Sequence, residues 1–176
     1  MFNTLTPTKL RPIVLTVSFL TGTLFTVNAQ QPQTYPRITG YFAVLQPIGS
    51  LNKYGFTDSF SGIHVIGFPF GMNILKSDSF GVSFEVVPSI RTEHGISKVN
   101  SVLFHPGAMF RFKHGFTFIG RAAFETSGRF GLTPVVNQVL VKGKHTNMYV
   151  ALPFSIRFGN DQPASIGTGV QVGVGF

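Results

Sequence analysis

The chain has no cysteine and no tryptophan, and only 11% of its residues are charged. The absence of cysteine excludes a disulfide framework and a lipid-modified cysteine after a leader. The scarcity of charge, together with 20 Phe and 20 Gly, is a poor composition for a soluble helical domain. After residue 30 no apolar run reaches the about 20 residues that a membrane-spanning helix needs. We therefore expect the apolar residues to lie in strands.

A basic and then an apolar segment opens the chain. Lys9 and Arg11 precede an uncharged stretch at 13–27, and the small-residue pattern ending at Ala29 is typical of a signal peptide cleaved before Gln30. A transmembrane anchor is the alternative, but the stretch is short and diluted by Thr, Ser and Gly. The expected domains are a cleaved signal peptide at 1–29, a short N-terminal segment at 30–36 and a β-barrel at 37–176.

Residues 165–176 alternate strictly between apolar or β-branched side chains and small or polar ones. A period of two predicts a strand with one apolar face and one small, polar face. The same alternation recurs along the chain between clusters of turn residues. The expected strands are residues 37–47, 62–75, 80–90, 101–112, 116–130, 135–142, 148–158 and 165–176.

Chain length and strand number together indicate the architecture. A tilted transmembrane strand takes about 9–11 residues, so eight strands use roughly 80 and leave the rest for connections. We expect an all-β fold, a closed antiparallel transmembrane β-barrel of about eight strands in an up-and-down meander. A soluble sandwich, with the same Phe-rich faces buried against a second sheet, is the alternative. Short turns are expected at 76–79, 113–115 and 143–147, and outer loops at 49–60, 91–100, 130–135 and 159–164.

The first, second and sixth expected strands have a pattern that leaves their register open. In the first, either Tyr41 and Ala43 or Phe42 and Val44 face the lipid, and the alternation alone leaves both phases open. In the second, Pro69 lacks an N–H and is expected to interrupt the ladder, because proline inside a sheet is confined to edges and bulges.

The end of the chain carries a resemblance to a known class of protein. The alternating Val170, Val172 and Val174 with the final Phe176 resemble the assembly signal of bacterial outer-membrane β-barrel proteins. In pattern, the expected barrel resembles small eight-stranded outer-membrane barrels of the OmpA/OmpX size class. The resemblance implies a monomer in the bacterial outer membrane that meets the barrel-assembly machinery, membrane lipid and lipopolysaccharide.

Several charged side chains fall on the faces opposite the Phe rows. An eight-stranded barrel is just wide enough for side chains to fill it, so we expect these charges to pair with one another inside. A narrow anion-favouring channel is the alternative, because three Arg face two Glu. The expected lumen network is Glu85, Arg111, Arg121, Glu125 and Arg157, with His105 and Gln171 in the same phase.

Catalysis is a weaker hypothesis. The resemblance includes lipid A acylases, deacylases and proteases, and Glu93, His94 and Ser97 share one expected loop. Neighbouring loop residues usually point apart, so a solvated loop is the simpler interpretation, and His64 and the other histidines show no metal spacing. We expect no catalytic, cofactor or metal residues, and a structural or surface-interaction role.

The chain has a net charge of +8, but its basic residues do not form a cluster in the sequence. The expected rims each carry basic residues, which suit either lipid phosphates or plain solvation. An exported chain without a basic patch is not expected to bind nucleic acid. The rim residues are Lys53, Arg91, Lys98 and Arg129 at one end, and Lys76, Lys113, Lys142 and Lys144 at the other.

Overall fold

The structure is a computed structural model that describes residues 34–176, so the expected signal peptide lies outside the described residues. The described part consists of strands, short connections and one 3-10 turn, η1 (Lys113–Gly115). No helix within 34–176 has the length and apolar character needed to cross a membrane. The strands are β1 (Arg37–Asn52), β2 (Gly55–Asp58), β3 (Ile63–Gly67), β4 (Phe70–Leu75), β5 (Phe80–Glu93), β6 (Ile96–Arg111), β7 (Phe116–Glu125), β8 (Phe130–Lys142), β9 (Asn147–Phe158) and β10 (Ser165–Gly175).

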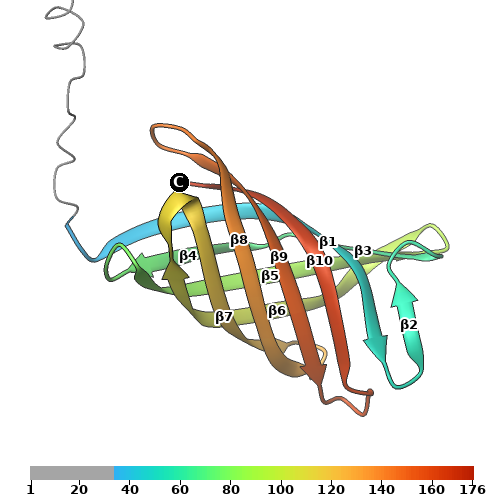
Figure 1. Ribbon diagram of the computed structural model, residues 1–176. Coiled ribbons are helices and arrows are strands. Elements are labelled where there is room, and N and C mark those ends of the chain that lie inside the picture. The colour runs from blue at the N-terminus through green and yellow to red at the C-terminus, as the bar shows by residue number, and fades with distance from the viewer. Residues whose placement is uncertain (1–33) are drawn as a thin grey trace, which may run out of the picture. The chain divides into compact units, whose positions relative to one another are not determined.

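The strands form one antiparallel meander whose hydrogen bonding runs in a ring. From β5 to β10 each strand pairs with the next, and β10 pairs with β1. β4 pairs with both β1 and β5, and β2, β3 and β4 together occupy the place of one strand, so the ring passes through eight strands. The expected all-β antiparallel meander is confirmed. Figure 1 shows the tilted strands wrapped around a common interior.

The period-two pattern separates an inner face from an outer one. On β7, Ile119 is only 4% exposed, whereas its neighbour Phe118 is 38% exposed. On β1, Tyr41 and Ala43 point inward, and Phe42 points outward, which resolves the phase that the sequence left open. Side chains of alternate residues must point to opposite faces of a strand, so each strand contributes to both surfaces.

The expected outer loop at 91–100 is wrong. β5 continues to Glu93 and β6 begins at Ile96, so the connection is the two residues His94 and Gly95, with φ of 49° and 78°. Positive φ at both central residues is the geometry of a tight hairpin turn. The residues on both sides of this turn are mostly polar, so they lack the apolar alternation that predicts a strand. They nevertheless continue the backbone pairing of β5 with β6.

The expected loop at 49–60 is also largely strand. β1 runs on to Asn52 and pairs with β2, with Leu51 opposite Phe56. The turn between them is fixed by the side-chain oxygen of Asn52, which accepts a hydrogen bond from the N–H of Tyr54 at 2.8 Å. This hairpin forms one side of the rim in Figure 1.

Pro69 interrupts the second strand where the sequence indicated. The expected strand at 62–75 divides into β3 and β4 around Phe68 and Pro69. The carbonyl of Pro69 still accepts a hydrogen bond from Ala43 at 2.7 Å, so β1 remains attached at the break. The missing donor of proline thus divides the strand without detaching it.

The sixth strand begins earlier than expected. β8 starts at Phe130, so the expected loop at 130–135 is wrong and the connection lies at 126–129. Gly131 falls within that expected loop, yet a Cβ there would lie 1.9 Å from the carbonyl oxygen of Ile156. This glycine allows close contact between β8 and β9 and does not end a strand.

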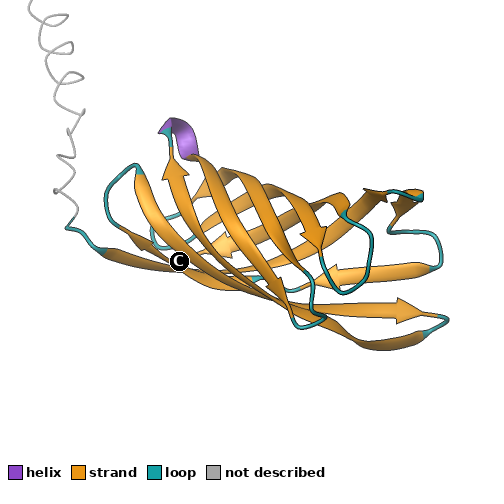
Figure 2. Ribbon diagram, turned by 90° about the horizontal axis from the view of Figure 1, so that it is seen from below, coloured by secondary structure: helices purple, strands orange, loops and turns teal. Residues whose placement is uncertain are grey.

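The interior is filled in layers. Toward the end with the turns at 76–79 and 112–116, apolar side chains including Leu75, Met109, Ile119 and Val135 pack into a buried core. Tyr41 and Tyr149 belong to this core and meet edge to face with ring centroids 6.2 Å apart. The hydroxyl groups of these two tyrosines belong to a layer of polar side chains in the middle of the interior, which we call the polar layer. Figure 2 shows the same ring of strands after a 90° turn.

Candidate functional site

Glu85 lies at the centre of the polar layer. One carboxylate oxygen accepts hydrogen bonds from Nη1 of Arg121 at 2.8 Å and from Nδ1 of His105 at 3.1 Å. The other accepts a hydrogen bond from the hydroxyl of Tyr41 at 3.0 Å. Nη2 of Arg121 donates to the same Tyr41 oxygen and to Ser83, at 3.0 and 3.1 Å. Side chains from β1, β6 and β7 therefore converge on one carboxylate of β5.

A second ion pair lies beside the first. Nε of Arg157 on β9 donates to Glu125 on β7 at 2.8 Å, and Nη1 donates to the hydroxyl of Thr133 at 3.0 Å. The same guanidinium also reaches the carbonyl oxygens of Leu132 and Ile156, each at 3.1 Å. The geometry fixes Arg157 against β8 and β9 as well as against its acidic partner.

His105 connects the two pairs. Its Nδ1 faces Glu85, while its Nε2 lies 3.0 Å from the hydroxyl of Thr133 and 3.3 Å from Nη2 of Arg157. A guanidinium nitrogen can only donate, so Nε2 must act as the acceptor. The imidazole is therefore neutral with its proton on Nδ1, and that proton is donated to Glu85.

The cluster is buried and its charges balance. Glu85 and Arg121 are each only 4% exposed, and Arg157 is 7% exposed. Two carboxylates face two guanidiniums, with a neutral histidine between them. Buried charges are tolerated only when paired and hydrogen bonded, and both pairs meet this condition except at Nε of Arg121, which has no hydrogen-bond partner within residues 34–176. The layer thus consists of paired charges and their neutral hydrogen-bond partners.

Two residues from the expected network lie apart from this cluster. Arg111, at the end of β6, makes no hydrogen bond to the cluster within the described residues, so the excess positive charge expected from three Arg is not present in the layer. Gln171 on β10 donates to the hydroxyl of Tyr149 at 3.1 Å and extends the polar layer toward β10.

Glycines on neighbouring strands make room for the large side chains. A Cβ on Gly107 would lie 2.7 Å from Cγ of Arg121, and one on Gly71 would lie 2.6 Å from the Tyr41 hydroxyl. A Cβ on Gly173 would lie 2.5 Å from the Tyr149 hydroxyl. The glycines of the inner face are therefore a packing requirement of the polar layer.

Neutral partners were missed in the sequence. Tyr41, Ser83, Thr133 and Tyr149 complete the hydrogen bonding, but an inspection of charged residues alone does not select them. The inward glycines are the signal that would have pointed to Tyr41 and Tyr149. A glycine on the inner face indicates that a large side chain from a neighbouring strand lies over it.

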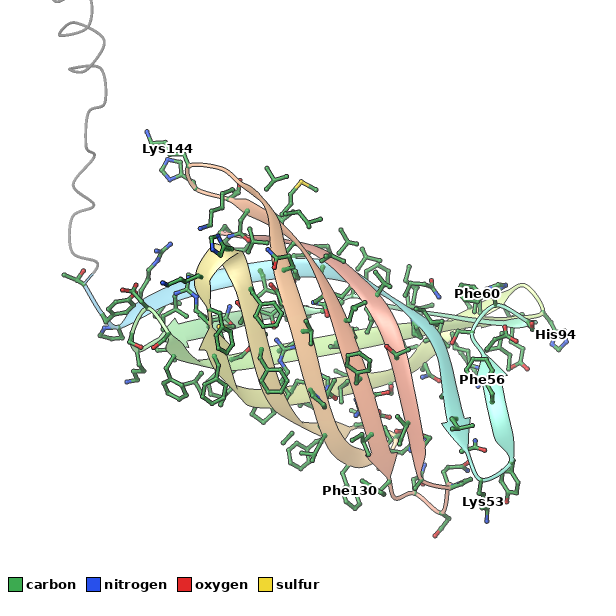
Figure 3. The ribbon with its side chains drawn as sticks, in the orientation of Figure 1. Lys53, Phe56, Phe60, His94, Phe130 and Lys144 are labelled. Carbon is green, nitrogen blue, oxygen red and sulfur yellow. The ribbon has the colours of Figure 1, made fainter. Side chains whose placement is uncertain are left out.

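Glu93, His94 and Ser97, weighed above as the weaker catalytic hypothesis, do not form a hydrogen-bonded group in the structure. The Glu93 carboxylate accepts a hydrogen bond from Arg91 at 2.9 Å, and the Ser97 hydroxyl lies 2.8 Å from that of Thr92. The Arg91 guanidinium holds the pKa of Glu93 below its usual range by hydrogen bonding and by charge. His94 occupies the tight turn at the tip (Figure 3).

The remaining expected residues lie at the ends and on the outer surface. The described residues contain no group of three or more His, Cys, Asp or Glu able to hold a metal ion. Lys53 lies over the ring of Tyr54, 4.9 Å from its centroid, and Arg129 donates to Ser165 at 3.1 Å. Lys53 and Lys144 mark opposite ends in Figure 3.

The residues of the expected assembly signal form the last strand and its end. Val172, Val174 and Phe176 are exposed on the outer surface, while Val170 is half-buried. The backbone of Phe176 exchanges hydrogen bonds with Gly40 on β1, at 2.8 and 2.9 Å. These residues thus continue the contact by which β10 meets β1.

Comparisons with known proteins return one solved structure. Neither a family model nor a curated protein matches the sequence. The solved structure is a solution NMR structure of the de novo designed protein TMB2.3, with a TM-score of 0.44 and 11% sequence identity. The match covers 79% of this chain and 95% of the designed one.

Proposed function

We propose that the protein is an integral outer-membrane β-barrel with a filled, non-catalytic interior and a structural or surface-interaction role. The observation that carries the proposal is the distribution of polar and apolar side chains, which is the reverse of that in a water-soluble protein. Glu85, Arg121 and Arg157 are buried inside, while large apolar side chains are exposed outside. A protein dissolved in water exposes few contiguous apolar patches of this kind, and a membrane-spanning barrel needs them.

The outer apolar surface extends around the ring. Aromatic pairs lie across neighbouring strands, and Phe130 projects from the wall in Figure 3. Hydrocarbon is the solvent that favours such a surface, because an exposed Phe in water forfeits the free energy of burial. The exposed phenylalanines of β4 to β9 are Phe70, Phe80, Phe84, Phe104, Phe110, Phe116, Phe118, Phe124, Phe130, Phe154 and Phe158.

The ring of backbone hydrogen bonds also favours a location in the membrane. In hydrocarbon an unpaired backbone group costs several kcal/mol, so sheets that cross a bilayer must pair their edges. The pairing of β10 with β1, from Tyr41 opposite Gly175 to Asn52 opposite Ser165, removes the two edges that a meander would otherwise expose. A soluble sandwich has no comparable need to join its first and last strands.

The filled interior favours a non-conducting barrel over a channel. The apolar core around Ile119 and Val135 lies next to the polar layer around Glu85, so both would have to move for a solute to pass. With membrane lipid and lipopolysaccharide as its surroundings and insertion by the barrel-assembly machinery, the protein acts as a monomer whose outer rim is available to partners.

Fractionation tests the proposal. The protein is expected in the outer-membrane fraction after a urea wash, with a mobility on gels that changes on boiling because a detergent-resistant barrel unfolds only when heated. Planar-bilayer recordings of the purified protein should show no steady conductance. A urea-soluble periplasmic protein whose mobility is unchanged by boiling would overturn the proposal, and a steady open pore would overturn its filled interior.

A further inference from the structure

The wall of the barrel divides between β1 and β3. Leu45 pairs with Gly67, and β1 resumes pairing only where Ser59 donates to the carbonyl of Ile48 at 3.0 Å. Between these two points β1 contributes residues 46–47, and the opposite segment, residues 60–66, has no backbone pairing with it. We call this opening the β1–β3 split. Figure 1 shows β1 and β2 leaving the direction of β3 at this end.

Two features of β1 cause the split. The register with β10 shifts between Pro47 and Gly49, so Ile48 forms a bulge that bends the strand. Pro47 has no N–H to donate to a neighbour. In place of the ladder, Nε2 of Gln46 donates to the carbonyls of Pro47 and Val65, at 2.9 and 3.4 Å. A single side chain therefore bridges the split.

A cavity of about 160 Å³ lies on the inner side of the split. Leu45 and Pro47 line it from β1, Val65 and Gly67 from β3, and Val87 and Leu103 from behind. The volume is well below the roughly 300 Å³ at which drug-sized sites begin, so only a slender group fits. Four polar residues complete the lining, namely Ser89, Asn100, Ser101 and Glu125.

The polar groups at the cavity are already engaged. Ser89 donates to the carbonyl of Ser101 at 3.1 Å, and its oxygen lies 3.5 Å from the amide nitrogen of Asn100. The Glu125 carboxylate binds Arg157 and Ser127 at 2.8 and 2.9 Å. With these groups satisfied by one another, the surface that is left for an occupant is mainly hydrocarbon.

The outer side of the split is apolar as well. Val44 and Ile48 are exposed on the outer face of β1, and Ile66 points away from the cavity on β3. Phe42 and Phe70, which are paired and face outward, lie three residues along the strands from Leu45 and Gly67, or about 10 Å. The path from the split thus leads to the surface that meets lipid.

We propose that the β1–β3 split admits the end of an alkyl chain from a membrane amphiphile into the cavity lined by Leu45, Val65, Val87 and Leu103. The inference rests on the proposed membrane location. Hydrocarbon lies outside, a cavity with a mainly apolar free surface lies inside, and one glutamine bridges the wall between them. Together they make a lateral binding site, and the bridge sets how readily a chain enters.

Detergent contacts test the site directly. In dodecylphosphocholine micelles, NOEs from the chain methylenes are expected at the methyl groups of Val87 and Leu103 as well as at the outward Val172. Inward Val135, which lies in the closed core, should show none. NOEs at Val172 without any at Val87 and Leu103 would overturn the lateral site alone. Their absence from Val172 too would count against the membrane location itself.

Variants of Gln46 and of the cavity lining provide a second test of the site. Gln46→Ala should raise chain occupancy by about two- to tenfold, as expected for the loss of one hydrogen bond. Gln138→Ala is the matched control, because Gln138 also donates to two carbonyls, of His114 and Val139, but its own backbone position is paired on both sides, with Phe116 and Val150. Leu103→Trp should fill the cavity and abolish the NOE at Val87 while that at Val172 remains. Equal effects of the two glutamine variants, or water contacts in place of chain contacts at Val87, would refute the proposal.

Discussion

Glu85 on β5 and Arg121 on β7 form an ion pair of 2.8 Å even though β6 runs between their strands. The pair can close because Gly107 on β6 has no side chain to obstruct the arginine, and because His105 on β6 joins the same carboxylate. The sheet is curved enough here for the next strand but one to come within reach. This contact fixes the centre of the polar layer.

Removal of the Glu85 carboxylate should destabilise the barrel severely. Glu85→Ala leaves Arg121 buried without its partner, which typically costs about 3–5 kcal/mol. The free energy of unfolding in detergent, measured with urea, should fall by that amount. Glu93→Ala is the matched control, because its pair with Arg91 lies half-exposed near the tip of the β5–β6 hairpin and such surface pairs contribute little to stability. Similar losses for both variants would contradict the special position of Glu85.

His105 is expected to carry its proton on Nδ1. The Nε2 atom accepts from Thr133 or Arg157, whereas Nδ1 donates to Glu85. Two-bond ¹H–¹⁵N correlation spectra of the imidazole should show a protonated Nδ1 and an unprotonated Nε2. Thr133→Val should leave this tautomer unchanged, since Arg157 still faces Nε2. A proton on Nε2 would contradict the hydrogen-bond arrangement of the whole layer.

Two glycines on adjacent strands should respond differently to the same substitution. A Cβ at Gly131 would lie 1.9 Å from the carbonyl oxygen of Ile156, whereas at Gly120 no atom lies within 4 Å. Gly131→Val should therefore separate β8 from β9 and abolish the band that shifts on boiling. Gly120→Val should retain it, because the new side chain meets open space on the outer face. Loss of the band in both variants would show that the strand contact is not the cause.

The Glu93 carboxylate should titrate below its usual range. Its pKa is lowered by the hydrogen bond and charge of Arg91. A depressed pKa means that the stabilising contribution is present above the unfolded-state value of about 4.3 and is lost as pH falls through the folded value. Carboxyl ¹³C shifts over a pH series measure it, and Arg91→Gln should raise the pKa toward the ordinary value.

Asp58 provides the control for this titration. Its pKa is lowered mainly by the backbone N–H of Phe60 and by Ser61, whose N–H also donates, at 2.8 and 2.7 Å. These donors are independent of Arg91, so Arg91→Gln should leave Asp58 unchanged. A parallel rise at both residues would mean that the long-range charge of the rim, and not the local contact, determines the pKa of Glu93.

The sequence predicted which face of most strands carries apolar residues, because alternation with a period of two is local. Phe104 and His105 on β6 take opposite faces for this reason alone. It failed where polar residues continue a strand, as in the extension of β5 to Glu93, since apolar alternation stops before the pairing does. Gly131 was misread because a close contact between strands and a turn both require glycine.

The candidate site was only partly predictable. The inward phase selected Glu85, Arg121, Glu125 and Arg157, and the structure brings these four into two ion pairs linked by His105. Arg111 also points inward by the alternation, but it is the last residue of β6 and lies away from the cluster. Alternation shows which face a side chain takes and not its position along the barrel axis. The β1–β3 split depends on the register between strands distant in sequence, which no local pattern encodes.

The proposed barrel requires one arrangement of side chains, in which alternate residues of each strand face hydrocarbon and a filled interior. Spin labels test it most directly, and because the chain contains no cysteine, single-cysteine variants carry one label each. Scanning residues 116–125 of β7 in lipid bilayers measures the collision of each label with oxygen, which concentrates in hydrocarbon, and with a water-soluble nickel chelate. High oxygen and low nickel accessibility are expected at Phe118 and Phe124, and low values of both at Ile119 and Ala123. High nickel accessibility at Phe118 and Phe124, or no period of two along the strand, would contradict it.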